Sequence, residues 1–155
     1  MEYTMCTAGE VPVAGLMGFT PDAAERHVPP NWTSYTEVTD IDATVAEVQK
    51  MGGKVMVPVM DVPQVGRFAI LQDPQGAVFA AITSARQPEA ETDPKPMEFS
   101  WHEPATSDLT AAIAFYAQTF GWNGQSDCDL GTMGPYHSDA TARRTCAVMR
   151  TTPGG

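Results

Sequence analysis

The sequence predicts an α+β fold made of two paired β-α-β-β-β modules. Apolar residues recur at helical spacing after Asp40, and strand-like apolar runs flank the tight corner Asp73–Gly76. The same order of signals returns 68 residues later, which indicates an internal duplication. A domain of 155 residues is long enough to bury a core without disulfides or metals.

The first module is expected over residues 31–84. The β-rich segment 33–39 predicts its first strand, and Asp40 is a good N-cap for the helix that follows. The apolar face of that helix carries Ile41, Val45 and Val48, and Gly52-Gly53 ends it. Three further strands are predicted at residues 54–59, 67–72 and 77–83, with the corner as the turn between the last two.

The second module is expected over residues 97–152. Its first strand is predicted at 99–105, and its helix begins after Asp108. The matched positions are Asp40 with Asp108, Ile41 with Leu109, Val45 with Ile113, Val48 with Tyr116, Gly53 with Gly121 and Asp61 with Asp129. The agreement of cap, apolar face and stop signal without a gap supports the duplication.

Residues 1–17 are similar to the C-terminal end of the chain, with Tyr3 matching Tyr136 and Ala14 matching Ala147. This segment is therefore expected to be the orphan C-terminal hairpin of an incomplete module. Residues 18–30 and 85–96 are rich in proline and charge, and both are expected to be linkers.

Composition excludes several classes of function. A net charge of −10, with no basic cluster apart from the pair Arg143-Arg144, argues against nucleic acid as a partner. Three cysteines without metal-ligand spacing favour reduced thiols over a disulfide framework. The N-terminus lacks the features of a secretory signal, and the apolar runs are too short to span a bilayer, so we expect a soluble, cytoplasmic protein with no membrane partner.

Three segments together resemble the vicinal-oxygen-chelate superfamily, which includes glyoxalases, bleomycin-resistance proteins and dioxygenases. They are VGRFAILQDPQGAVFAAI, FSWHEPATSDLTAAIAFYAQTFGW and PPNWTSYTEVTDIDATV. The resemblance implies a glyoxalase-like fold, in which paired βαβββ modules form an incomplete barrel around a small molecule, often beside a divalent metal. The order of the pieces resembles a truncated or permuted part of a tandem-domain member.

That order implies modules which do not normally pair within a domain, so they pair either in a permuted way or by module swapping between two chains. We expect a homodimer, because the orphan hairpin leaves strand edges to be covered.

The ligand positions implied by the superfamily are occupied here by Thr33, Ala80, Trp101 and Val148, none of which suits a divalent ion. We therefore predict no cofactor and a metal-free site. The alternative is a metal-dependent lyase, isomerase or dioxygenase, in which His102, as a metal ligand or acid/base group, and Glu103 act with carboxylates across a module interface. A third interpretation is a rearranged relic without a selected activity.

The predicted function is to bind a hydrophobic or aromatic small molecule in a cup between modules. Aromatic side chains suit such a site, and a carboxylate would add a polar contact. The expected ligand-binding residues are Tyr35, Glu37, Phe68, Phe79, Phe99 and Trp101. Tyr35 and Trp101 are the preferred pocket walls because they lie on the first strands of the two modules.

Overall fold

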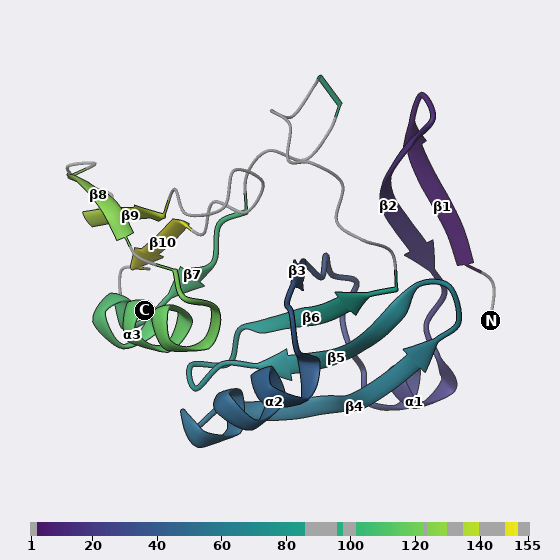
Figure 1. Cartoon of the computed structure of the whole chain (residues 1–155), viewed down its shortest axis with the longest axis horizontal. Coiled ribbons are helices and arrows are strands. Elements are labelled where there is room, and N and C mark those ends of the chain that lie inside the picture. The colour runs from purple at the N-terminus through teal and green to yellow at the C-terminus, as the bar shows by residue number, and fades with distance from the viewer. Residues whose placement is uncertain are drawn as a thin grey trace. The chain divides into compact units, whose positions relative to one another are not determined.

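The computed structural model describes residues 3–85, 96–97, 102–122, 124–129, 135–139 and 148–151, and side chains as far as residue 122. The chain divides into two compact units. One holds Met1–Trp32 with Pro94–Phe99, and the other holds Thr33–Asp93 with Ser100–Gly155. Figure 1 shows the elements of both.

The first unit contains a hairpin and a short helix. Strands β1 (Tyr3–Ala8) and β2 (Val11–Met17) are antiparallel and form a two-stranded sheet. Helix α1 (Pro21–Glu25) lies inside the segment predicted to be a linker. The side chain of Thr20 caps it by accepting a hydrogen bond from the backbone N–H of Ala23 at 3.1 Å. Threonine as the N-cap, followed by proline in the first turn, favours the start of a helix. Proline in this segment therefore begins a helix here.

The larger unit opens with a four-stranded sheet in the order β3-β6-β5-β4. Its strands are β3 (Tyr35–Glu37), β4 (Lys54–Val62), β5 (Gly66–Gln72) and β6 (Val78–Ser84). Strand β3 runs parallel to β6, and the other neighbours are antiparallel. Helix α2 (Ile41–Lys50) connects β3 to β4 and lies against this sheet (Figure 1).

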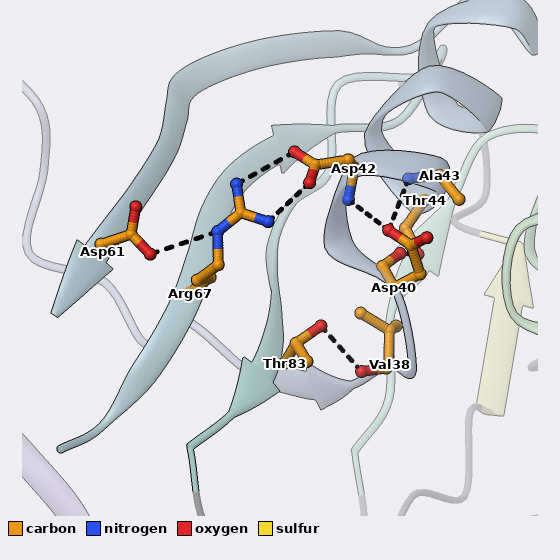
Figure 2. A network of polar contacts seen from close by, with 8 residues as sticks. All are labelled: Val38, Asp40, Asp42, Ala43, Thr44, Asp61, Arg67 and Thr83. Atoms are coloured by element: carbon orange, nitrogen blue, oxygen red, sulfur yellow. Dashed lines mark hydrogen bonds and ion pairs between the residues drawn. The ribbon is translucent and has the colours of Figure 1, made fainter. Parts of the chain in front are cut away.

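Helix α2 begins where the sequence predicts it. The carboxylate of Asp40 accepts hydrogen bonds at 3.0 Å from the backbone N–H groups of Asp42 and Ala43, as Figure 2 shows. Ile41 and Val48 are buried against Ala69 and Leu71 of β5. The apolar stripe read from the sequence is therefore the face that packs on the sheet.

The second module of this unit repeats the order of the first. Helix α3 (Leu109–Phe120) follows strand β7 (Ala105–Thr106), and the sheet order is β7-β10-β9-β8. The remaining strands are β8 (Gly124–Asp129), β9 (Pro135–Asp139) and β10 (Val148–Thr151). Strand β7 is parallel to β10, as β3 is to β6. The predicted α+β class is confirmed.

Strand β7 differs from the prediction of a first strand over residues 99–105. The described ladder pairs only Ala105 and Thr106 with β10, and residues 98–101 lie outside the described part of the chain. Pro104 directly precedes the ladder and has no N–H to donate to it, which is a physical reason for a short strand.

The two modules share one core. The ring of Phe79 on β6 lies 6.3 Å from that of Phe115 and 5.9 Å from that of Tyr116, both on α3. Phe120 contributes a third ring at 5.7 Å from Phe79. In the described part of the chain, no helix has the length and apolar character needed to cross a membrane.

The corner between β5 and β6 also connects the modules. The side-chain Oε1 of Gln75 accepts hydrogen bonds from Thr106 Oγ1, from Ser107 Oγ at 3.1 Å and from the backbone N–H of Asp108 at 2.9 Å. Its Nε2 donates to the backbone carbonyl of Asp108 at 2.9 Å. One amide side chain thus fixes the segment that leads into α3, a role that the composition of the corner did not indicate.

Candidate functional site

The two faces of the first sheet differ in what they contact. Ala69, Leu71, Phe79 and Ala81 belong to the buried core cluster that contains residues of α2 and α3. Because side chains alternate along a strand, their neighbours in sequence point to the other face. The strand register confirms this, since one transverse row contains Glu37, Ile82, Phe68 and Met60, and the next contains Tyr35, Ala80 and Ile70.

We call this second surface the open face. Its members are Tyr35, Glu37, Met60, Phe68, Ile70, Val78, Ala80 and Ile82. Several large apolar side chains on it are accessible: the exposed fraction is 52% for Tyr35, 44% for Met60 and 46% for Val78. Contiguous exposed apolar surface of this kind is typical of an interaction site.

An aromatic pair lies on the open face. The rings of Tyr35 on β3 and Phe68 on β5 pack edge to face with centroids 5.8 Å apart. Between these strands runs β6, where Ala80 is fully buried. Because alanine carries only a methyl group, the rings from the two outer strands meet above it.

A carboxylate is fixed at the end of the same strand β3. Oε1 of Glu37 accepts a hydrogen bond from the backbone N–H of Ser84 at 2.9 Å. Oε2 accepts one from the Ser84 hydroxyl at 2.5 Å. The Glu37 side chain is exposed, so these two bonds give it a defined orientation while water and ligands still reach it.

A second polar pair lies where the two modules meet. Nδ1 of His102 and Oγ of Ser34 are 3.1 Å apart, and both side chains are half-buried. The two positions are 68 residues apart, so they are equivalent positions of the two modules. A residue that contacts its own equivalent lies at the approximate two-fold axis of the pair. The sequence predicted His102 with Glu103 and not Ser34, although the 68-residue offset applied to His102 leads directly to Ser34.

Comparison with known proteins agrees with this architecture. CFP32 of Mycobacterium tuberculosis, described as a glyoxylase, is 41% identical over 85 residues, which are 55% of this chain and 31% of CFP32. DauV of Streptomyces sp. strain C5, described as an anthracycline biosynthesis protein, is 35% identical over 103 residues, which are 66% of this chain and 38% of DauV. The chain therefore spans about a third of the length of these relatives. No protein-family model matches it.

Among solved structures, a glyoxylase/bleomycin resistance protein/dioxygenase domain from Frankia sp. superimposes with a TM-score of 0.56 over 81% of this chain and 99% of that domain. Its sequence identity is 12%, so this likeness concerns the fold. These relatives and this fold support the resemblance of the chain to the vicinal-oxygen-chelate superfamily. The two module sheets of the chain, not closed into a barrel in the part that the structure describes, have the glyoxalase-like fold.

A divalent metal is often associated with this superfamily, and the described residues do not fit one. Ala80, at the implied last-strand ligand position, has no donor atom, and Nδ1 of His102 faces a hydroxyl. No three side chains of His, Cys, Asp or Glu converge within the described residues. Hard and borderline divalent ions need carboxylate, imidazole or carbonyl donors in a convergent set. Glu103 is exposed next to His102, and the side chains of Trp101 and Val148 lie outside the described residues.

The structure brings together three of the six expected ligand-binding residues, namely Tyr35, Glu37 and Phe68. Phe79 requires a correction, because it is only 8% exposed and packs in the core on the opposite face. Its odd position on β6 aligns it with Leu71, whereas the open face carries the even positions of β5 and β6. Phe99 and Trp101 lie outside the described residues.

Proposed function

We propose that this chain binds a hydrophobic or aromatic small molecule on the open face, and that binding needs no metal. The observation that carries the proposal is the accessible pair of Tyr35 and Phe68, surrounded by apolar side chains on a sheet face. Aromatic rings in this arrangement favour stacking and edge contacts with a flat apolar ligand, and the half-exposed Met60 can adapt to its shape.

The two relatives support a function of the glyoxalase and bleomycin-resistance type. The name of DauV refers to the biosynthesis of anthracyclines, which are flat polycyclic aromatic molecules, and the name of CFP32 refers to a glyoxylase. A flat aromatic ligand is compatible with the chemistry of the open face. Since the chain spans about a third of these relatives, their activities come to it only as proposals.

Binding of 1-naphthalenemethanol, followed by titration calorimetry, tests the proposal. Removing one ring by Phe68→Ala or Tyr35→Ala should weaken binding about fivefold, because an aromatic pair contributes on the order of 1 kcal/mol. Phe19→Ala is the matched control, since Phe19 is also exposed, at 51%, but belongs to the other unit. Affinity should not change when EDTA is added. Equal losses in all three variants would contradict the proposal.

A second candidate is a metal-dependent lyase, isomerase or dioxygenase that uses His102. The observation in its favour is that His102 is half-buried where the modules meet. Uptake of nickel, manganese and zinc by the purified protein distinguishes the two candidates. Stoichiometric uptake that is lost in His102→Ala would support this second candidate and overturn a metal-free site.

We also propose that the chain forms a homodimer. Within the described residues, β1 and β2 pair only with each other, so each has a free edge. Several of their apolar side chains are exposed, with fractions of 54% for Met5, 56% for Leu16 and 62% for Met17. Free edges with apolar side chains favour association. Light scattering should give twice the chain mass of 16.6 kDa, and a monomer at all concentrations would refute the dimer.

A further inference from the structure

We propose that the ligand of the open face is an organic cation, with an aromatic or apolar body that carries an ammonium group, and that Glu37 recognises its charge. This inference rests on the proposed function and adds the charge of the ligand to it. Three features of the described residues carry it: the orientation of the Glu37 carboxylate, its position beside the aromatic pair, and the distribution of basic side chains.

The Glu37 carboxylate is oriented but not neutralised. Its two hydrogen bonds come from the backbone N–H and the hydroxyl of Ser84, which are neutral donors. Each carboxylate oxygen has a second lone pair, so both oxygens can accept a further hydrogen bond from a ligand. A pre-oriented carboxylate loses little conformational entropy when it binds a cation.

No basic side chain competes for this carboxylate within the described residues. The ion pairs there join Arg26 to Asp22, Lys50 to Glu47, and Arg67 to Asp42 and Asp61, and none includes Glu37. The side chain of Arg67 pairs with Asp42 of α2, on the opposite side of the sheet (Figure 2). Lys50 and Arg67, the described cations of this unit that form ion pairs, thus contact carboxylates that do not belong to the open face.

The aromatic pair lies beside the carboxylate. Tyr35 and Glu37 are two residues apart on β3, so they project from the same face with about 7 Å between their Cα atoms. An ammonium group between them would contact both the carboxylate and the tyrosine ring, whose face attracts cations. The apolar body of the same ligand would lie over Phe68 and Met60, which follow Glu37 in its transverse row.

Among the described residues, the basic side chain that shares the register of the open face lies far from Glu37. Lys54 pairs with Gln72, and Gln72 with Val78, so Lys54 lies three strands and about two rows from Glu37. Strand spacing makes this about 20 Å. Such a distance exceeds the Debye length of about 8 Å at physiological salt, so Lys54 does not offset the carboxylate. The net charge of −10 further favours the approach of cations.

Three probes with the same ring test the inference: 1-naphthylmethylammonium, neutral 1-naphthalenemethanol and anionic 1-naphthoate. Calorimetry at pH 7 should show the cation binding five- to tenfold more tightly than the neutral probe, with the anion weakest. This preference should shrink at 0.5 M salt, because the carboxylate is exposed and the attraction is screened.

Glu37→Gln should abolish the preference for the cation. The matched control is Glu47→Gln, which removes the same charge from α2 and should keep the preference. Ser84→Ala, which removes the hydroxyl that holds Oε2, should reduce the preference partially and provides a second variant if Glu37→Gln does not fold.

The outcomes separate this inference from the proposed function. Binding of the neutral probe that depends on Phe68, without a preference for the cation, would overturn the inference and leave the proposed function intact. An equal loss of preference in Glu37→Gln and Glu47→Gln would also overturn it, because overall charge would then be the cause. Failure of all three probes to bind would overturn both.

Discussion

At the scale of single residues, Asp73 connects the corner of the first module to the helix of the second. It is 4% exposed, and its carboxylate accepts hydrogen bonds from Gln75 N–H at 2.9 Å, Ala77 N–H at 2.8 Å and Tyr116 O–H at 3.1 Å. Burial, and next the nearby Asp73, raise the pKa of Tyr116 far above its ordinary value. The phenol is therefore protonated at neutral pH and donates to Asp73.

We predict that Tyr116→Phe lowers the free energy of unfolding by about 1–3 kcal/mol, because it removes a donor from a buried carboxylate. Urea denaturation measures this change. Tyr3→Phe is the control, since Tyr3 is 59% exposed and its loss of a hydroxyl should cost little. If both variants were destabilised equally, the bond to Asp73 would have no special role.

Arg67 on β5 and Asp42 on α2 form an ion pair, which Figure 2 shows. The guanidinium of Arg67 donates to both carboxylate oxygens of Asp42, and this hydrogen bonding holds the pKa of Asp42 below its usual range. A lowered pKa in the folded state means that the pair stabilises above the unfolded-state value of about 4. This stabilisation disappears as the pH falls through the lower folded-state value.

The difference in unfolding free energy between the parent protein and Asp42→Asn should therefore be present at pH 7 and decline as the pH falls below about 4. It should also shrink in 1 M salt, because both side chains are exposed. In an Arg67→Gln background the same substitution should show no such pH dependence. A difference that persists at pH 2 would rule out the ion pair as its cause.

At the scale of elements, the corner Asp73–Gly76 is more than a turn. Gln75 makes hydrogen bonds to three successive residues, from Thr106 to Asp108, directly before α3. Asp108 in turn caps α3 by accepting from the backbone N–H of Ala111 at 3.0 Å. The side chain of one module thus supports the helix start of the other.

We predict that Gln75→Ala loosens the start of α3. Hydrogen exchange of the first turns of α3 should become faster, while the amides of α2 keep their protection. The reason is that the hydrogen bonds of Gln75 support the start of α3 and not α2. Overall stability should fall by about 1–2 kcal/mol. Gln49→Ala, an exposed substitution on α2, is the control and should leave exchange in α3 unchanged. Uniform acceleration across both helices would instead indicate general destabilisation.

Signals from neighbouring residues predicted where the helices begin and end. Features that depend on contacts between distant elements could not be predicted from the sequence. Asp40 and Asp108 cap both helices, and Gly121 adopts the left-handed conformation with φ 73° at the end of α3, because these features depend on neighbours in sequence. The side on which Phe79 points depends on which face of the sheet α2 and α3 cover. An aromatic residue suits either face of the sheet, so the residue type alone did not predict whether Phe79 faces the core or the open face.

At the scale of the whole molecule, the duplication explains both what the sequence predicted and what it missed. The sheet orders of the two modules correspond strand for strand, as the 68-residue offset implies. The pair of Ser34 and His102 also follows from that offset, but only once the modules are known to face each other. Sequence alone left open whether they pair within one chain or between two.

We predict that the two modules pair within one chain, even in a homodimer. Hydrogen bonds from Gln75 and Asp73 join the modules over separations of 31 to 43 residues, and a shared aromatic core surrounds them. Swapping would have to break and reform all of these contacts in a second chain. Pairing within one chain makes the same contacts without the entropic cost of association, which favours this arrangement.

A cross-linking experiment tests this pairing. Ser34→Cys and His102→Cys are combined in a chain whose native Cys6, Cys128 and Cys146 are replaced by alanine, and a short bis-maleimide is added. Because Ser34 Oγ and His102 Nδ1 lie 3.1 Å apart, the two thiols should be joined efficiently. Pairing within one chain leaves the denatured product at the mass of one chain, 16.6 kDa. A covalent dimer at low protein concentration, absent in either single-cysteine variant, would show instead that the modules are swapped.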